Sequence, residues 1–155
     1  MDAFVAFKYL HIVAMFFAVA LAISGELVLR QVANSRNAVA IVTTAARVKP
    51  LANLSTGLFL AGIGFGFVAA ITGNMNLLAP WLLLAYAAFL AAMAIGITVT
   101  DPWVGRLEKA AEASAGGSSD ALDAVIDDPL ARAATWALMF LVAFLVFVMV
   151  VKPLS

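Results

Sequence analysis

The chain has no cysteine, one histidine and few charged residues. The lack of cysteine excludes disulfides, thiolate metal sites, cysteine-held iron–sulfur clusters and covalent haem attachment of the c type. The formal net charge is zero, so the charge balance indicates no nucleic-acid partner. The sequence also lacks a Ser/His/Asp set, a zinc-protease motif, a phosphate-binding loop and a dinucleotide fingerprint, so it predicts no catalytic residue.

Hydrophobic residues make up 65% of the chain and charged residues 12%, which is far from the soluble average. Four long apolar stretches cause this bias, at 4–29, 51–71, 81–99 and 133–151. Each can cross a bilayer core, which takes about 20 helical residues. The first stretch exceeds a typical signal-peptide core and follows no positive cluster, so we expect it to remain as a span. We predict an all-α polytopic membrane protein, a four-transmembrane-helix antiparallel bundle in one domain of 155 residues.

Lysine and arginine predict the orientation of the bundle. Segment 30–50 carries four of them and segment 100–132 carries three, whereas 72–79 carries none. Lys8 and Lys152 are the other two. Because cytoplasmic loops hold the excess of positive charge, we expect 30–50 and 100–132 to be cytoplasmic loops and both termini to lie outside, as a multi-pass protein of the cell membrane.

Prolines predict where three of the spans begin. Proline in the first helical turn loses no hydrogen bond, because that N–H would be unpaired anyway. Pro50, Pro80 and Pro129 are therefore expected to open the second, third and fourth spans, with Asp128 as the N-cap of the last.

The segment between the third and fourth spans is expected to hold a short amphipathic helix and, at 120–128, an acidic helical turn over the membrane surface. Asp101 is the predicted N-cap of this helix, which covers about 102–113 with Trp103 and Leu107 facing the membrane interface. A flexible Ser/Gly linker is expected to follow at 114–119.

Small residues predict which helix faces pack together. The second span contains a Gly62-x-x-x-Gly66 pair along with Gly57 and Gly64. Such faces let helix backbones approach closely in lipid. The other small-residue faces comprise Ala14, Ala18, Ala22 and Gly25 in the first span and Ala88, Ala92 and Gly96 in the third. The last span is bulky nearly all round, so we expect it to face lipid or a partner subunit, either a second copy of the chain or another membrane protein.

His11 is the one residue that suggests chemistry. It lies three residues after Lys8 and four before Met15, so the three share a helix face. An ionisable residue inside a span is costly without a partner and indicates function. Imidazole is a common axial ligand of haem iron, and methionine is a common second ligand. The alternative is a structural His11 near the headgroups, hydrogen-bonded to water, lipid or a neighbouring backbone.

Glu26 lies fifteen residues after His11, about 22 Å along the helix, so the two cannot share a metal. We expect it to pair with Arg30 at i+4, with a proton-relay role as the alternative. Ser55, Thr56 and Thr98 are expected to form hydrogen bonds between helices.

The segment Lys8-Tyr9-Leu10-His11-Ile12, followed by an apolar helix with Gly25, resembles the start of a group of bacterial four-helix membrane proteins. The group includes the HemJ-type protoporphyrinogen oxidases, the membrane domain of CopD copper-resistance proteins and a sister family of unknown function, to which this chain looks most similar. The resemblance implies a bacterial inner-membrane protein with haem b at His11, as in HemJ-type proteins, or copper, as in CopD-type proteins.

The chain offers no second histidine for a haem. A second axial ligand would come from a methionine, from water or from another chain. The methionines in question are Met15, Met75, Met93 and Met139. Three functions stay open: a protein that binds haem or a metal with a redox or haem-handling role, a non-catalytic accessory subunit of a membrane complex, and a small transporter component.

Overall fold

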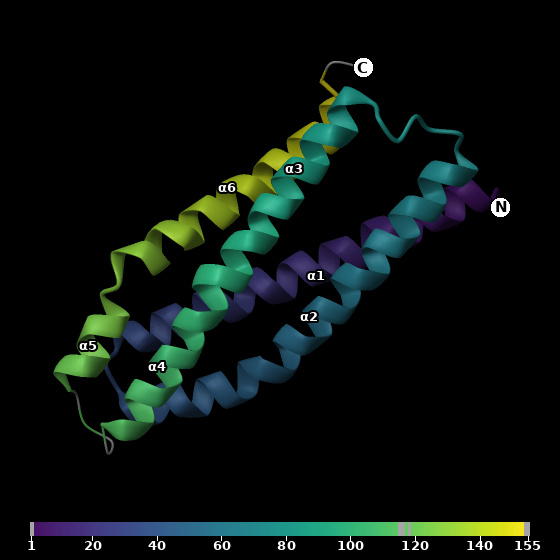
Figure 1. The fold of residues 1–155 in the computed structure, drawn as a ribbon. Helices are drawn as coiled ribbons and strands as arrows, with labels where there is room; N and C mark the ends of the chain where they lie inside the picture. The colour runs from purple at the N-terminus through teal and green to yellow at the C-terminus, as the bar shows by residue number, and fades with distance from the viewer. Residues whose placement is uncertain (1, 115–116, 118, 154–155) are drawn as a thin grey trace.

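The computed structural model describes residues 2–114, 117 and 119–153. Every regular element in these residues is a helix (Figure 1). The helices are α1 (Ala3–Asn34), α2 (Ala38–Thr72), α3 (Pro80–Ile95), the π-helical segment η1 (Gly96–Thr100), α4 (Asp101–Ala113), α5 (Asp120–Ile126) and α6 (Pro129–Val151). Four helical stretches are long and apolar enough to cross a membrane. The prediction of an all-α bundle with four spans is confirmed.

The long helices associate as two pairs. α1 packs against α2, and α3 packs against α6 (Figure 1). Two aromatic contacts connect the pairs between α2 and α3, with ring centroids 6.3 Å apart for Phe59 and Phe89 and 6.4 Å apart for Phe67 and Tyr86. α4 packs on α2, and α5 contacts both α4 and α1.

Small residues explain the close approach of α1 and α2. Ala14, Ala18 and Gly25 of α1 are buried, as is Gly62 of α2. A Cβ atom at Gly25 would lie 2.9 Å from the Val48 side chain, so this approach requires glycine. The prediction of close packing is wrong at four other small residues. A Cβ atom at Gly57, Gly64 or Gly96 would meet nothing within 4 Å, and Ala22 is exposed.

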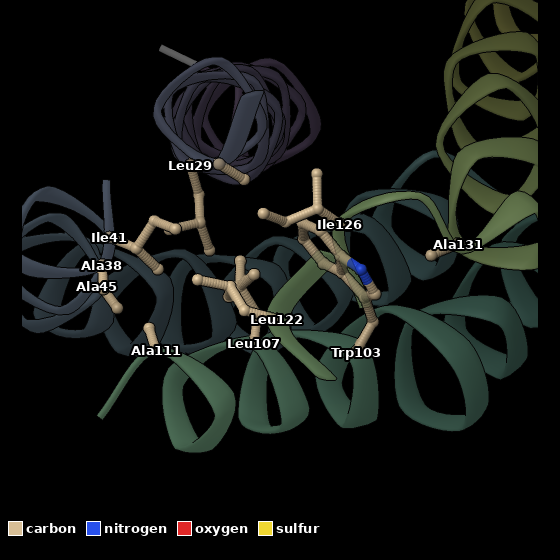
Figure 2. Packing of buried hydrophobic residues seen from close by; sticks show 11 residues of the cluster. Leu29, Ala38, Ile41, Ala45, Trp103, Leu107, Ala111, Leu122, Ile126 and Ala131 are labelled. Carbon is tan, nitrogen blue, oxygen red and sulfur yellow. The ribbon is translucent and has the colours of Figure 1, made fainter. Parts of the chain in front are cut away.

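A cluster of buried apolar residues lies at the end of the bundle where α1, α2, α4, α5 and α6 meet. Figure 2 shows Leu107 and Leu122 at the centre of this cluster. Trp103 is only 1% exposed, and its indole N–H donates to the Val125 carbonyl at 2.9 Å. The amphipathic helix is confirmed, but the prediction that Trp103 and Leu107 face the membrane interface is wrong, because both side chains fill the space between helices.

Two predicted helix starts are confirmed and one is wrong. Pro80 and Pro129 lie in the first turns of α3 and α6, and the Asp128 carboxylate caps α6 by accepting from the Leu130 N–H at 2.9 Å. Pro50 instead lies inside α2. This helix begins twelve residues earlier, after Asn37, because Ala38, Ile41 and Ala45 are buried in the cluster beneath α4.

The predicted N-cap at Asp101 is also wrong. The chain runs from α3 through η1 into α4 without leaving helical geometry, and Thr100 has a helical φ of −70° and ψ of −51°. Segments 30–50 and 100–132, expected as loops, are therefore largely helical. Residues 115, 116 and 118 of the expected linker lie outside the described residues.

The start of α1 and the end of α6 lie at the same end of the bundle as the 73–79 connection. A Cβ atom at Gly73 would lie 2.8 Å from the Phe4 ring, and the Lys152 ammonium lies 5.2 Å from the Trp81 ring centroid. Residues 35–37 and helix α5 lie at the opposite end (Figure 1). Seven of the nine lysine and arginine residues, those in segments 30–50 and 100–132, are thus separated from the termini. The predicted orientation, with both termini outside, requires this separation.

Candidate functional site

His11 lies on α1 and faces α2. Its Nδ1 atom lies 2.7 Å from the carbonyl oxygen of Gly62. A Cβ atom at Gly66 would lie 2.8 Å from the same nitrogen and 3.0 Å from Cε1. The two glycines of the predicted Gly62-x-x-x-Gly66 pair therefore accommodate the imidazole, one by supplying an acceptor and the other by lacking a side chain.

This hydrogen bond sets the chemistry of the His11 ring. A carbonyl oxygen can only accept, so Nδ1 carries the hydrogen. In the neutral imidazole, Nε2 then keeps its lone pair for a metal or for another donor. A ring N–H donated to a backbone carbonyl is the usual support of a metal-ligating histidine. The geometry is compatible with a ligand, and also with the structural alternative of a histidine bonded to a neighbouring backbone.

The structure brings Met15 to the same helix interface and leaves Lys8 out of it. A Cβ atom at Gly62 would lie 2.6 Å from the Met15 sulfur, so the thioether packs directly on the α2 backbone. Lys8 is exposed, with its ammonium 5.6 Å from the centroid of the Phe4 ring. Of the three residues predicted to share a face, two meet α2.

Met15 of the same chain does not fit as the second axial ligand of a haem held by His11. The two residues are one turn apart on α1, a rise of about 6 Å, and both contact α2. Axial ligands reach the iron from opposite faces of the porphyrin, so a macrocycle between these side chains would intersect the helix itself. A haem at His11 would therefore need a second ligand other than Met15 of the same chain.

His11 and Met15 could instead hold a single metal ion together, because side chains at i and i+4 of a helix can chelate one ion. The described residues contain no group of three or more histidine, aspartate or glutamate side chains that could hold a metal. Nitrogen and thioether donors from His11 and Met15 suit a soft ion such as Cu(I), with the remaining ligands supplied from elsewhere.

Glu26 forms the predicted ion pair with Arg30, whose Nε atom lies 3.2 Å from the carboxylate. The two side chains are only 14% and 16% exposed. Glu26 also accepts from the Thr135 hydroxyl, and Arg30 donates to the Ala131 carbonyl at 2.5 Å. The Arg30 guanidinium lies 4.2 Å from the Trp103 ring centroid. This polar cluster ties α1 to α6 and α4.

Thr135 was not predicted from the sequence. It is the only hydroxyl residue of α6, a signal that could have identified it. Its side chain is also 3.1 Å from the Ala131 carbonyl, and a hydroxyl with one hydrogen donates to that oxygen or to Glu26.

Hydroxyl residues elsewhere follow the prediction only in part. Ser55 is buried and donates to the Ala18 carbonyl of α1 at 2.8 Å, which confirms a hydrogen bond between helices. Thr56 and Thr98 each donate to the carbonyl four residues earlier in the same continuous helical stretch, so the prediction is wrong for both.

Ion pairs hold the segments at the charged end. Arg36 pairs with Asp127 at 2.8 Å and with Asp123. The Arg36 guanidinium donates hydrogen bonds to these two carboxylates, and these bonds, the one to Asp127 first, raise the pKa of Arg36. Arg106 pairs with Asp128, the cap of α6, at 2.8 Å. The connection between α1 and α2 is thereby tied to the segment that leads into α6.

Comparisons of the chain with protein-family models, curated proteins and solved structures find no match. The resemblance to HemJ-type and CopD-type proteins therefore depends on the short sequence around His11 and on the four-helix layout, and it stays a hypothesis.

Proposed function

We propose that this membrane protein binds haem b or a metal ion through Nε2 of His11 and has a redox or haem-handling role. The observation that carries the proposal is the 2.7 Å hydrogen bond between Nδ1 and the Gly62 carbonyl. That bond fixes the ring orientation and, in the neutral ring, leaves the lone pair of Nε2 free to bind a metal.

The residues around His11 have different roles in the proposed site. The Gly62 carbonyl orients the imidazole as a ligand. Gly66 leaves the space that the ring occupies. Haem or a redox metal, when bound, would supply the one-electron chemistry. Glu26 takes no part in ligation, because it lies about 22 Å farther along α1.

The proposal also bears on assembly. Since Met15 of the same chain does not fit as a haem ligand together with His11, a second ligand would come from another methionine, from water or from another chain. A second copy or another membrane subunit could contact α6, where Trp136 is 69% and Phe140 is 67% exposed. Such exposure is equally suited to lipid, so it supports no partner by itself.

The test is the haem and metal content of the protein purified in mild detergent from cells supplied with haem precursor. We expect close to one haem or one metal ion per chain, or one per two chains if two copies share it. His11→Ala should lose at least nine-tenths of this content. Met15→Leu is the matched control on the same helix face, and it should keep haem fully while lowering the content of a chelated metal ion.

Equal content in wild type and His11→Ala would contradict the proposal. Wild-type protein free of haem and metal would also contradict it. Co-purification of other membrane subunits with such a colourless protein would favour the accessory-subunit alternative.

A further inference from the structure

A cavity of about 190 Å³ lies at the charged end of the bundle, where α1, α4, α5 and α6 meet. Its lining combines two guanidinium groups, one amide, one indole and two apolar side chains. These belong to Arg30, Arg132, Asn34, Trp103, Ala33 and Ile126. Since a water molecule occupies about 30 Å³ in the liquid, the cavity has room for a group the size of about six waters. A phosphate group, with five non-hydrogen atoms, fits this space.

The position of the cavity along the helices points to the level of lipid headgroups. Arg30 directly follows the first predicted span at 4–29, and Arg132 directly precedes the last at 133–151. Trp103 lies four residues beyond the third span. The cavity therefore opens where the hydrocarbon core ends, and basic pockets between helices on this side of a membrane bind anionic headgroups.

The Arg30 guanidinium is held in place by contacts that leave N–H donors for an anion. Its contacts to Glu26 and Ala131 use two of the five N–H donors of a guanidinium, and it also lies over the Trp103 ring, 4.2 Å from the centroid. Fixed guanidinium groups bind phosphate oxygens in a bidentate manner at a small entropic cost.

Arg132 supplies the second positive charge and can move. Its side chain is 63% exposed, and its nearest paired carboxylate is Asp127 at 3.9 Å. Asp127 also accepts from Arg36 at 2.8 Å, so its charge is shared between two arginines. Arg132 can therefore turn to an anion in the cavity without leaving Asp127 unpaired.

We propose that this cavity binds a phosphate group, carried either by an anionic lipid headgroup or by free phosphate, with Arg30 as the fixed contact and Arg132 as the mobile one. The site lies at the opposite end of α1 from His11 and does not depend on a ligand there.

Thermal unfolding of delipidated protein in detergent tests the proposal, with phosphatidylglycerol, phosphatidylcholine or inorganic phosphate added in separate arms. A ligand that binds only the folded state raises its stability, and saturating phosphatidylglycerol should raise the Tm by about 5 °C. Arg132→Gln should lose more than half of this rise. Arg47→Gln removes the same charge from an exposed position of α2 at the same end, outside the cavity, and should keep it.

The arms distinguish the two sources of phosphate. A rise with phosphatidylglycerol alone indicates a lipid headgroup, and an equal rise with inorganic phosphate indicates the free ion. Native mass spectrometry gives a second readout, with at least twofold more phosphatidylglycerol retained by wild type than by Arg132→Gln. An equal response of Arg132→Gln and Arg47→Gln would overturn the proposal, as would the absence of any response in the wild type.

Discussion

Glu26 and Arg30 are both mostly withdrawn from solvent, and they obtain their partners from three helices. The carboxylate contacts Arg30 on its own helix and Thr135 on α6, while the guanidinium contacts Ala131 and stacks on Trp103 of α4. Removing one member of such a set leaves another polar group without its partner, which is more costly than losing an exposed pair.

We therefore predict that Glu26→Gln lowers the free energy of unfolding by roughly 1–3 kcal/mol, because Arg30 keeps its charge but loses its counter-charge. The measurement is thermal or denaturant unfolding in detergent micelles. Glu112→Gln, at an exposed position of α4, is the control and should change stability by less than about 0.5 kcal/mol. Equal stabilities of the two variants would show that the cluster does not hold the helices together.

The sequence predicts the contact between Glu26 and Arg30 but not the contacts of these two residues with α6. Glu26 and Arg30 are four residues apart, so helical geometry alone brings them together. Thr135 lies 109 positions from Glu26, and its contact depends on how α6 returns to α1. No local pattern in the chain contains that information.

At the scale of helices, the packing of α1 against α2 depends on which glycines of α2 lie opposite bulky side chains of α1. Gly62 and Gly66 lie opposite Met15 and His11, whereas Gly64 faces open space. Glycines on one helix can therefore have opposite structural roles although their sequence context is similar.

We predict that Gly66→Ala displaces the His11 imidazole, because the new Cβ atom would lie 2.8 Å from Nδ1. Overpacking of this kind should lower the free energy of unfolding by about 1 kcal/mol or more, and it should at least halve any ligand content that depends on His11. Gly64→Ala is the matched control and should leave both unchanged within error. Unfolding and ligand analysis of the two variants measure this, and a Gly66→Ala protein identical to Gly64→Ala would contradict the packing described.

The helix ends show which local signals decide structure. Asp128 and Pro129 begin α6 as predicted, because nothing upstream continues that helix. Pro50 and Asp101 carry similar signals, yet both lie inside helical stretches. Buried contacts of 38–45 with α4 stabilise the helix before Pro50, and a missing backbone donor in a span is tolerated where neighbouring groups compensate.

At the scale of the whole molecule, the sequence predicts the four spans because each needs only its own hydrophobic residues. The charged end of the bundle was harder to predict. Segments 30–50 and 100–132 look like loops in composition, but Trp103, Leu107 and Leu122 bury one another there. This cluster forms only when α1, α2, α4, α5 and α6 meet, so no local pattern in the sequence predicts it.

The orientation in the membrane is testable because the chain has no cysteine of its own. We predict that Leu78→Cys, at a position 72% exposed in the 73–79 connection, reacts with an impermeant maleimide in intact cells. Ser35→Cys, exposed at the opposite end, should react only after permeabilisation. Labelling in the reverse order would contradict the orientation that the positive residues predict.

The central claim is that His11 ligates a cofactor, and the absorption spectrum of the purified protein tests it most directly. For haem b, we predict a Soret band in the oxidised protein and sharp α and β bands after reduction, all lost in His11→Ala and all retained in Met15→Leu. For a copper ion in place of haem, those bands are absent and metal analysis of the same samples shows the loss in His11→Ala. A spectrum and a metal content that are unchanged by His11→Ala would contradict the account.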